Sequence, residues 1–187
     1  MKRLLPLAIA ISVSGCAIYS LVQPGKVEVG NAFRVEPAFE WSRVEVGNVE
    51  IWTINGSGLE AVQFIKGVED GEAPFQSLSG PGEKKLQKYR KGMNPVEIQD
   101  LMISNLKSLG AVKLDVDTQA PMKLKGADAF RTELTYALED GLRRKAIIVT
   151  AVKSDKLFVV SYFGVKLHYF GKYKDDVERL FTTIEVL

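Results

Sequence analysis

Few side chains of this sequence are suited to acid–base or nucleophilic chemistry. The 187 residues include one cysteine, Cys16, and one histidine, His168. A serine-hydrolase arrangement would have to combine His168 with residues such as Ser161 and Asp175, but no serine lies in a nucleophile-elbow motif. A single cysteine forms neither an internal disulfide nor a cysteine-rich zinc site. We therefore expect a protein that is not an enzyme, with His168 as a polar residue near the start of a helix.

Two acidic clusters provide candidate oxygen ligands for a hard cation such as calcium. They are Glu69-Asp70-Gly71-Glu72 and Asp115-Val116-Asp117. Neither has the ligand spacing of an EF-hand loop, and a solvated strand edge explains the second equally well. The glycine-rich segments 55–58 and 80–84 lack the spacing and the Ser or Thr of a phosphate-binding loop, so they predict turns. The sequence therefore predicts neither a metal site nor a cofactor.

Basic residues gather in two segments, one in a loop or short helix and one at the start of a strand. The candidate surface-binding residues are Lys84, Lys85, Lys88, Arg90, Lys91, Arg143, Arg144 and Lys145. Near a membrane, each such cation gains about 1 kcal/mol from an anionic surface. An acidic protein partner is a second interpretation. The alternative is a solvated surface on which neighbouring Asp and Glu residues balance the charge.

The segment before Cys16 has the order of a secretory signal peptide. Met1-Lys2-Arg3 is positively charged, and residues 4–13 are an apolar run about half as long as a bilayer-spanning helix. The run ends in Val13-Ser14-Gly15-Cys16, which resembles the lipobox of bacterial lipoproteins. This resemblance implies cleavage before Cys16 and acyl chains on that residue, which together hold a protein firmly on a membrane. A buried core thiol and a signal peptide cleaved without lipidation are the alternatives.

The resemblance to lipoproteins also implies a location. An aspartate directly after the cysteine often retains such proteins in the inner membrane, and Ala17 stands there instead. We therefore expect a protein of the bacterial cell envelope that faces the periplasm and is anchored to the outer rather than the inner membrane. The expected organisation is a signal peptide at 1–15, a short tether at 16–25 and a single domain at 26–187.

The charge balance excludes one class of partner. The full chain carries 25 Lys and Arg against 23 Asp and Glu residues, and removal of residues 1–15 takes Lys2 and Arg3 away. The remaining domain is formally neutral, whereas nucleic-acid binding depends on a cationic surface. We therefore do not expect nucleic acid as a partner. A hydrophobic content of 46% is typical of one globular domain with a sizeable core.

Hydrophobic periodicity predicts the elements that would position these residues. A helix is expected at 95–109, with Asn94 as N-cap, Pro95 at the first turn and Glu97 completing a capping box. A second amphipathic helix is expected around 173–184. Strands are expected at 32–36, 44–46, 49–54, 61–66, 130–138, 146–152 and 157–163. The last two are apolar on both faces, which places them mid-sheet under cover on each side. The predicted class is therefore α/β (α+β), an antiparallel sheet layered with helices in an α-β-α sandwich.

The final third of the chain resembles the PsbP/Mog1-like group. The resemblance is carried by Gly126-Ala127-Asp128-Ala129-Phe130, the Asp140-Gly141 hairpin, the two apolar strands, and Tyr169-Phe170 before an amphipathic helix. It implies an α-β-α sandwich found in many bacterial lipoproteins, and it implies no catalytic residue.

These observations lead to a hypothesis and two alternatives. We expect an envelope lipoprotein that acts as a non-catalytic binding or scaffold module for another envelope protein. One alternative is an envelope-directed hydrolase that uses an acidic residue such as Asp115 or Asp117. The other is a small-ligand carrier with a pocket between sheet and helices, lined by Trp41, Trp52 or Phe163.

Overall fold

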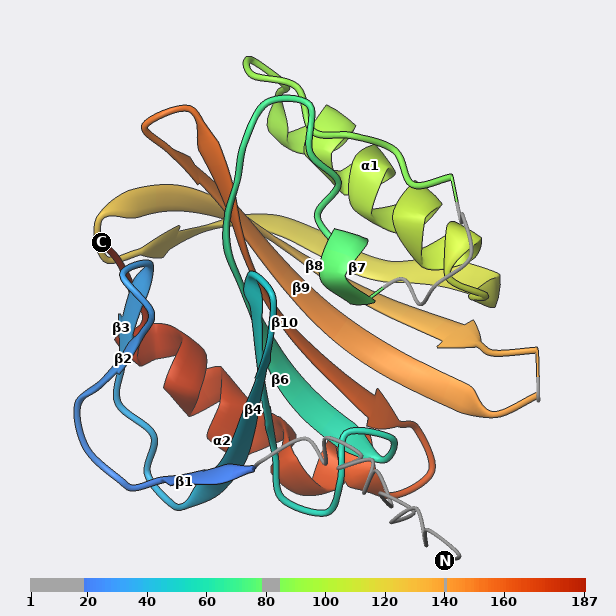
Figure 1. The fold of residues 1–187 in the computed structure, drawn as a ribbon. Coiled ribbons are helices and arrows are strands. Elements are labelled where there is room, and N and C mark those ends of the chain that lie inside the picture. Colours follow the sequence, from blue (N-terminus) through green and yellow to red (C-terminus); the bar gives the residue numbers. More distant parts are fainter. Residues whose placement is uncertain (1–18, 79–84, 140) are drawn as a thin grey trace, which may run out of the picture.

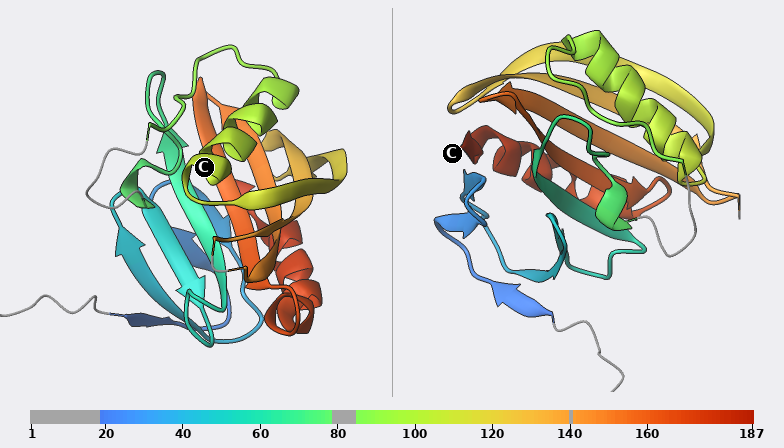
Figure 2. Two further views of the ribbon diagram at one scale, coloured as in Figure 1. Left: turned by 90° about the vertical axis from the view of Figure 1, so that its right-hand side faces the viewer. Right: turned by 45° about the horizontal axis from the view of Figure 1, so that its top comes forward.

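The computed structural model describes residues 19–78, 85–139 and 141–187 and shows an antiparallel sheet between two helices (Figure 1). Eight strands form the main sheet in the order β1-β4-β5-β6-β10-β9-β8-β7, and a smaller sheet has the order β11-β3-β2. Helix α1 (Pro95–Ser108) and helix α2 (Tyr169–Thr183) lie on opposite faces of the main sheet (Figure 2). The predicted α-β-α sandwich of the α+β class is therefore confirmed.

The strands of the main sheet are β1 (Ser20–Val22), β4 (Trp41–Val46), β5 (Val49–Thr53), β6 (Glu60–Val68), β7 (Val112–Leu124), β8 (Ala127–Ala137), β9 (Arg143–Lys153) and β10 (Lys156–Val165). The smaller sheet consists of β2 (Val27–Val29), β3 (Phe33–Val35) and β11 (Glu185–Val186). A short 3₁₀ helix, η1, covers Gln76–Leu78. Neither α-helix of the described part has the length and hydropathy needed to cross a bilayer.

The core consists of two layers because the central strands are apolar on both faces. Along β9, Ile147 and Val149 pack on the α2 side, whereas Ala146 and Ile148 pack on the α1 side. All four side chains are at most 2% exposed. This alternation follows from the period of two along a strand. It confirms the prediction that β9 and β10 lie mid-sheet with cover on each side.

Helix α1 begins where its capping residues predict. The Asn94 side chain accepts hydrogen bonds from the backbone N–H groups of Val96 (2.9 Å) and Glu97 (3.1 Å). The Glu97 carboxylate in turn accepts from the Asn94 backbone N–H at 2.7 Å. This reciprocal arrangement satisfies donors that the first turn of a helix otherwise leaves without partners. The predicted capping box is confirmed.

Strands β1, β2, β7 and β11 were not among the predicted strands. Strand β1 lies inside the expected tether at 16–25 and pairs with β4 at one edge of the main sheet. Strand β7 forms the opposite edge, and its thirteen residues are mostly exposed. The C-terminal strand β11 pairs with β3, where Glu185 bonds Arg34 at 2.9 Å. Strands β1 and β11 depend on pairing with distant segments, which hydrophobic periodicity does not report, whereas β7 pairs with the next strand, β8.

Candidate functional site

An apolar groove of about 620 Å³ lies between the start of α1 and the β7–β8 hairpin. Residues around the start of α1 form one wall of the groove, and residues of β7 and β8 form the other. The last residues of β9 also line the groove. The lining residues are Met93, Pro95, Ile98, Pro121, Met122, Lys123, Asp128, Ala129, Phe130, Thr150, Ala151 and Val152. Almost all of this surface is hydrocarbon or thioether, which suits contact with apolar groups.

The charged residues of the groove lie at its rim. Lys123 and Asp128 face each other across the β7–β8 hairpin at 3.5 Å, and their side chains are 87% and 88% exposed. An ion pair this exposed contributes little to stability. Met93 lies on the wall next to α1, and its flexible thioether chain adapts to differently shaped partners. The groove is therefore built for apolar contact, with polar groups only at its edge.

The opposite face of the sheet holds a cluster of buried charges under α2. Glu133 on β8 is 7% exposed and bonds Lys145 at 2.8 Å and Arg131 at 3.1 Å. Lys174 of α2 reaches the same carboxylate at 3.3 Å. Arg131 also bonds Glu178 of α2 at 2.6 Å. The face of β8 that carries Arg131 and Glu133 is therefore covered by α2, and its charges are neutralised internally.

The Glu133 carboxyl is held in its ionised form. Burial alone raises its pKa, but the hydrogen bonds from Lys145 and Arg131, together with the charges of Lys145 and Lys174, outweigh that effect. Its pKa falls from 4.5 to about 2. A carboxylate so acidic neither donates nor accepts a proton readily near neutral pH. The geometry therefore fits a structural link between β8 and α2 and not acid–base chemistry.

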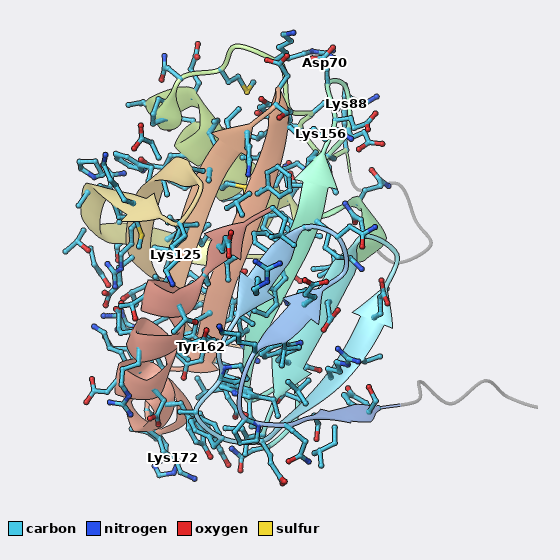
Figure 3. All side chains as sticks on the ribbon, turned by 90° about the vertical axis from the view of Figure 1, so that its left-hand side faces the viewer. Asp70, Lys88, Lys125, Lys156, Tyr162 and Lys172 are labelled. Atoms are coloured by element: carbon cyan, nitrogen blue, oxygen red, sulfur yellow. The ribbon has the colours of Figure 1, made fainter. Side chains whose placement is uncertain are left out.

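Lys91 and Arg143, one from each basic segment, lie at opposite ends of β9. Lys91 pairs with Asp155 in the β9–β10 turn, whereas Arg143 is the first residue of β9. The eleven residues of β9 place these ends about 35 Å apart along the strand. Lys88 lies beside Asp70 and Lys156 at the first of these ends (Figure 3). The structure thus does not bring Lys91 and Arg143 together into one surface.

The predicted surface cations differ in their accessibility. Lys85, Lys88, Arg90 and Arg143 are exposed. Lys145 is not an open cation, because its side chain is 23% exposed and engaged by Glu133 and by Asp117 at 3.1 Å. Arg144 lines a separate cavity on the α1 side and donates to the Gly58 carbonyl at 2.8 Å. Lys84 and Cys16 lie outside the described residues.

The residues considered for catalysis are not assembled. His168 is exposed at the start of α2, as expected, and its side chain does not cap the helix. The Ser161 hydroxyl is buried without a hydrogen-bond partner, so it does not bond His168. Asp175 is exposed on α2. Within the described ranges, no group of three or more His, Cys, Asp or Glu side chains is arranged to hold a metal ion.

The three aromatic residues considered for the alternative of a ligand pocket lie in different places. Trp41 and Trp52 are 2% and 0% exposed and pack with Phe64 in the core on the α2 side. Phe163 instead lines the cavity on the α1 side. The groove residues Met93 and Pro121 were missed, because they come from segments that no local motif connects.

Solved structures share this fold at low sequence identity. Cyanobacterial PsbP (CyanoP) from Synechocystis sp. PCC 6803 superimposes with a TM-score of 0.56 at 12% identity, over 95% of this chain and 98% of that chain. A protein of unknown function from Pseudomonas aeruginosa gives a TM-score of 0.51 at 8% identity, over 87% and 96%. A Bacteroides thetaiotaomicron structure gives 0.49 at 12% identity over 89% of this chain, which spans about half (49%) of that one.

These similarities concern the fold. No protein-family model matches the chain, and no curated protein matches it by sequence. The PsbP-like sandwich expected from the final third is confirmed, and the structural likeness extends over nearly the whole chain.

Proposed function

We propose that this protein is a non-catalytic binding module of the bacterial cell envelope, anchored by lipid on Cys16, whose groove receives apolar side chains of an envelope protein. The observation that carries the proposal is the 620 Å³ groove with its almost wholly apolar lining. Apolar residues around the groove extend this surface. Val152 at its end is 39% exposed, and Val96 at the start of α1 is 60% exposed. An apolar surface that continues beyond a cavity favours a protein partner over an enclosed small molecule.

The position of the proposed anchor fits this function. Cys16 precedes Ser20, the first residue of β1, by four residues. A chain of that length reaches about 14 Å when extended, so acyl chains on Cys16 would hold β1 close to the membrane. Strand β1 forms one edge of the main sheet and β7 forms the other. The groove, which β7 helps to line, would then face away from the membrane towards a partner.

The test is photo-crosslinking in intact bacteria with a photoreactive amino acid at Val152. The matched control is the same replacement at Val46, which is also 39% exposed but lies on β4, outside the groove. We expect one dominant crosslinked envelope protein from Val152 and none from Val46. The same pattern at both positions, or no product from Val152, would contradict a binding groove.

The anchor is tested separately in the same cells with Cys16→Ser. We expect incorporation of labelled palmitate into the native chain and none into the variant, with loss of the Val152 crosslink in the variant. Labelling that persists in Cys16→Ser would contradict lipidation at this residue. If the Cys16→Ser variant is not labelled but still gives the Val152 crosslink, the binding groove is supported and the requirement for a lipid anchor is refuted.

A further inference from the structure

A second cavity, of about 270 Å³, lies at the other end of α1 from the groove and shares no lining residue with it. The loop that precedes β6, the C-terminal part of α1 and the first residues of β9 surround it. Phe75, Leu106 and Phe163 supply apolar walls, and Gln63, Tyr136 and Arg144 supply polar groups. The cavity therefore combines a hydrocarbon surface with a small number of hydrogen-bonding groups, which is the usual composition of a small-molecule site.

Arg144 is the charged residue among those that line this cavity, and its guanidinium has unused donors. Its Nη2 donates to the Gly58 carbonyl oxygen at 2.8 Å. Its Nε is buried and has no hydrogen-bond partner among the described residues. By contrast, Arg34 and Arg131 each contact two carboxylates. A buried N–H without an acceptor is costly, so Arg144 is a donor that a bound anion would satisfy.

Tyr136 places a second donor in the same cavity. Burial raises the pKa of its phenol to about 12, although the positive charge of Arg144 acts in the opposite direction. The phenol therefore keeps its proton near neutral pH and is able to donate a hydrogen bond. Its ring meets Phe163 edge to face, with centroids 6.5 Å apart. This contact fixes the tyrosine ring against the apolar part of the cavity.

We propose that this cavity binds a small monocarboxylate with an apolar body, such as an arylacetate or a short-chain fatty acid. A guanidinium matches the geometry of a carboxylate, and the Tyr136 hydroxyl supplies a further donor. One cationic side chain lines the described cavity, which suits one negative charge better than a doubly charged phosphate. The volume of about 270 Å³ suits a ligand no larger than a single aromatic ring or a short chain attached to the carboxylate. The site is independent of the groove and does not require it to bind a protein.

The test is isothermal titration of the purified chain with phenylacetate, phenylacetamide and phenyl phosphate. We expect phenylacetate to bind at least about tenfold more tightly than the neutral amide, because a charge-assisted bond to Arg144 is lost with the amide. Equal affinity for phenylacetate and phenylacetamide, or no binding of phenylacetate at millimolar concentration, would overturn the proposal. Tighter binding of phenyl phosphate would overturn the choice of a carboxylate.

Substitutions locate the bound ligand. Arg144→Gln should weaken phenylacetate binding at least about tenfold, and Tyr136→Phe should weaken it several-fold. The matched control is Arg143→Gln, which removes the same charge from the neighbouring exposed residue on the other face of β9 and should leave affinity unchanged. If Arg144→Gln and Arg143→Gln weaken phenylacetate binding equally, the ligand is attracted by net charge alone, and the proposed site is overturned. The comparison of phenylacetate with its amide uses the native chain, so it remains decisive even if Arg144→Gln unfolds.

Discussion

Replacing Glu133 with Gln should destabilise the protein by about 3 kcal/mol near neutral pH. The substitution keeps the shape of the side chain but removes the negative charge that Arg131, Lys145 and Lys174 share. Arg131 retains Glu178 and Lys145 retains Asp117, whereas no other carboxylate contacts Lys174 among the described residues. The loss therefore falls mainly on the link between β8 and α2.

The magnitude follows from the pKa of Glu133, which falls from 4.5 to about 2 on folding. One pKa unit corresponds to about 1.4 kcal/mol, so the ionised carboxylate contributes about 3 kcal/mol. Because the folded-state pKa is below that of the unfolded chain, this contribution is complete above about pH 5. It declines as the pH falls through 4.5, and it is absent below about pH 2. About 2 kcal/mol of it is lost by pH 3.

Urea denaturation followed by tryptophan fluorescence measures this effect. Trp41 and Trp52 are at most 2% exposed in the folded protein, so their emission should shift to the red on unfolding. The difference in unfolding free energy between the native chain and Glu133→Gln should shrink from about 3 kcal/mol at pH 7 to about 1 kcal/mol at pH 3. Because the native chain and Glu133→Gln are compared at the same pH, the contributions of the other carboxylates to the unfolding free energy cancel.

The control is Asp128→Asn, which removes a carboxylate whose ion pair with Lys123 is almost fully exposed. It should not change stability measurably at either pH, because water screens such pairs. The reasoning is refuted if Glu133→Gln costs less than about 1 kcal/mol at pH 7, or if its cost does not depend on pH between 7 and 3.

Two further predictions concern the helices. At Gly164 an added Cβ would lie 2.8 Å from the Cα of Phe170, so Gly164→Ala should push α2 away from β10 and destabilise by about 1 to 3 kcal/mol. At Gly171 in α2 the same change meets no atom within 4 Å and should stabilise by about 1 kcal/mol. Urea denaturation of both glycine variants measures their unfolding free energies. Changes of the same sign in the two variants would contradict the described packing of α2 on β10. Asn94→Ala should cost about 1 kcal/mol, whereas Asn94→Asp keeps the capping acceptor and should cost little. Hydrogen exchange in the first turn of α1 should increase only in the alanine variant, and equal protection in both would refute the cap.

Elements with local signals could be predicted from the sequence. The start of α1 depends on Asn94, Pro95 and Glu97, which lie within four positions of one another. Strands β9 and β10 depend on continuous apolar runs, and both runs do lie at the centre of the sheet. In each case the residues that determine the structure are neighbours in the chain, so their pattern is visible without knowledge of the fold.

Strand β7 shows why other elements were missed. Its sequence does alternate, with Val112, Leu114 and Val116 separated by polar residues, but the strand is mostly exposed, contains Pro121 and has register shifts where it pairs with β8. Proline and irregular pairing are typical of edge strands, where they discourage association with other chains. The local alternation of β7 was therefore available in the sequence, and its pairing with the next strand, β8, agrees with that pattern. The groove was missed for a different reason, since its walls meet only in the folded chain.

The run Arg143-Arg144-Lys145 shows how a strand divides a sequence motif. Because side chains alternate between faces, Arg143 and Lys145 point to the α2 side and Arg144 points to the α1 side. Lys145 is held by Glu133 in the buried cluster, whereas Arg144 lines a cavity without a carboxylate partner among the described residues. A basic run that suggests one surface thus becomes an exposed cation, a potential anion receptor and a structural ion pair. Its function follows from the face on which each residue lies, so Arg144, with its buried and unpartnered Nε, is the member of the run that a ligand would engage.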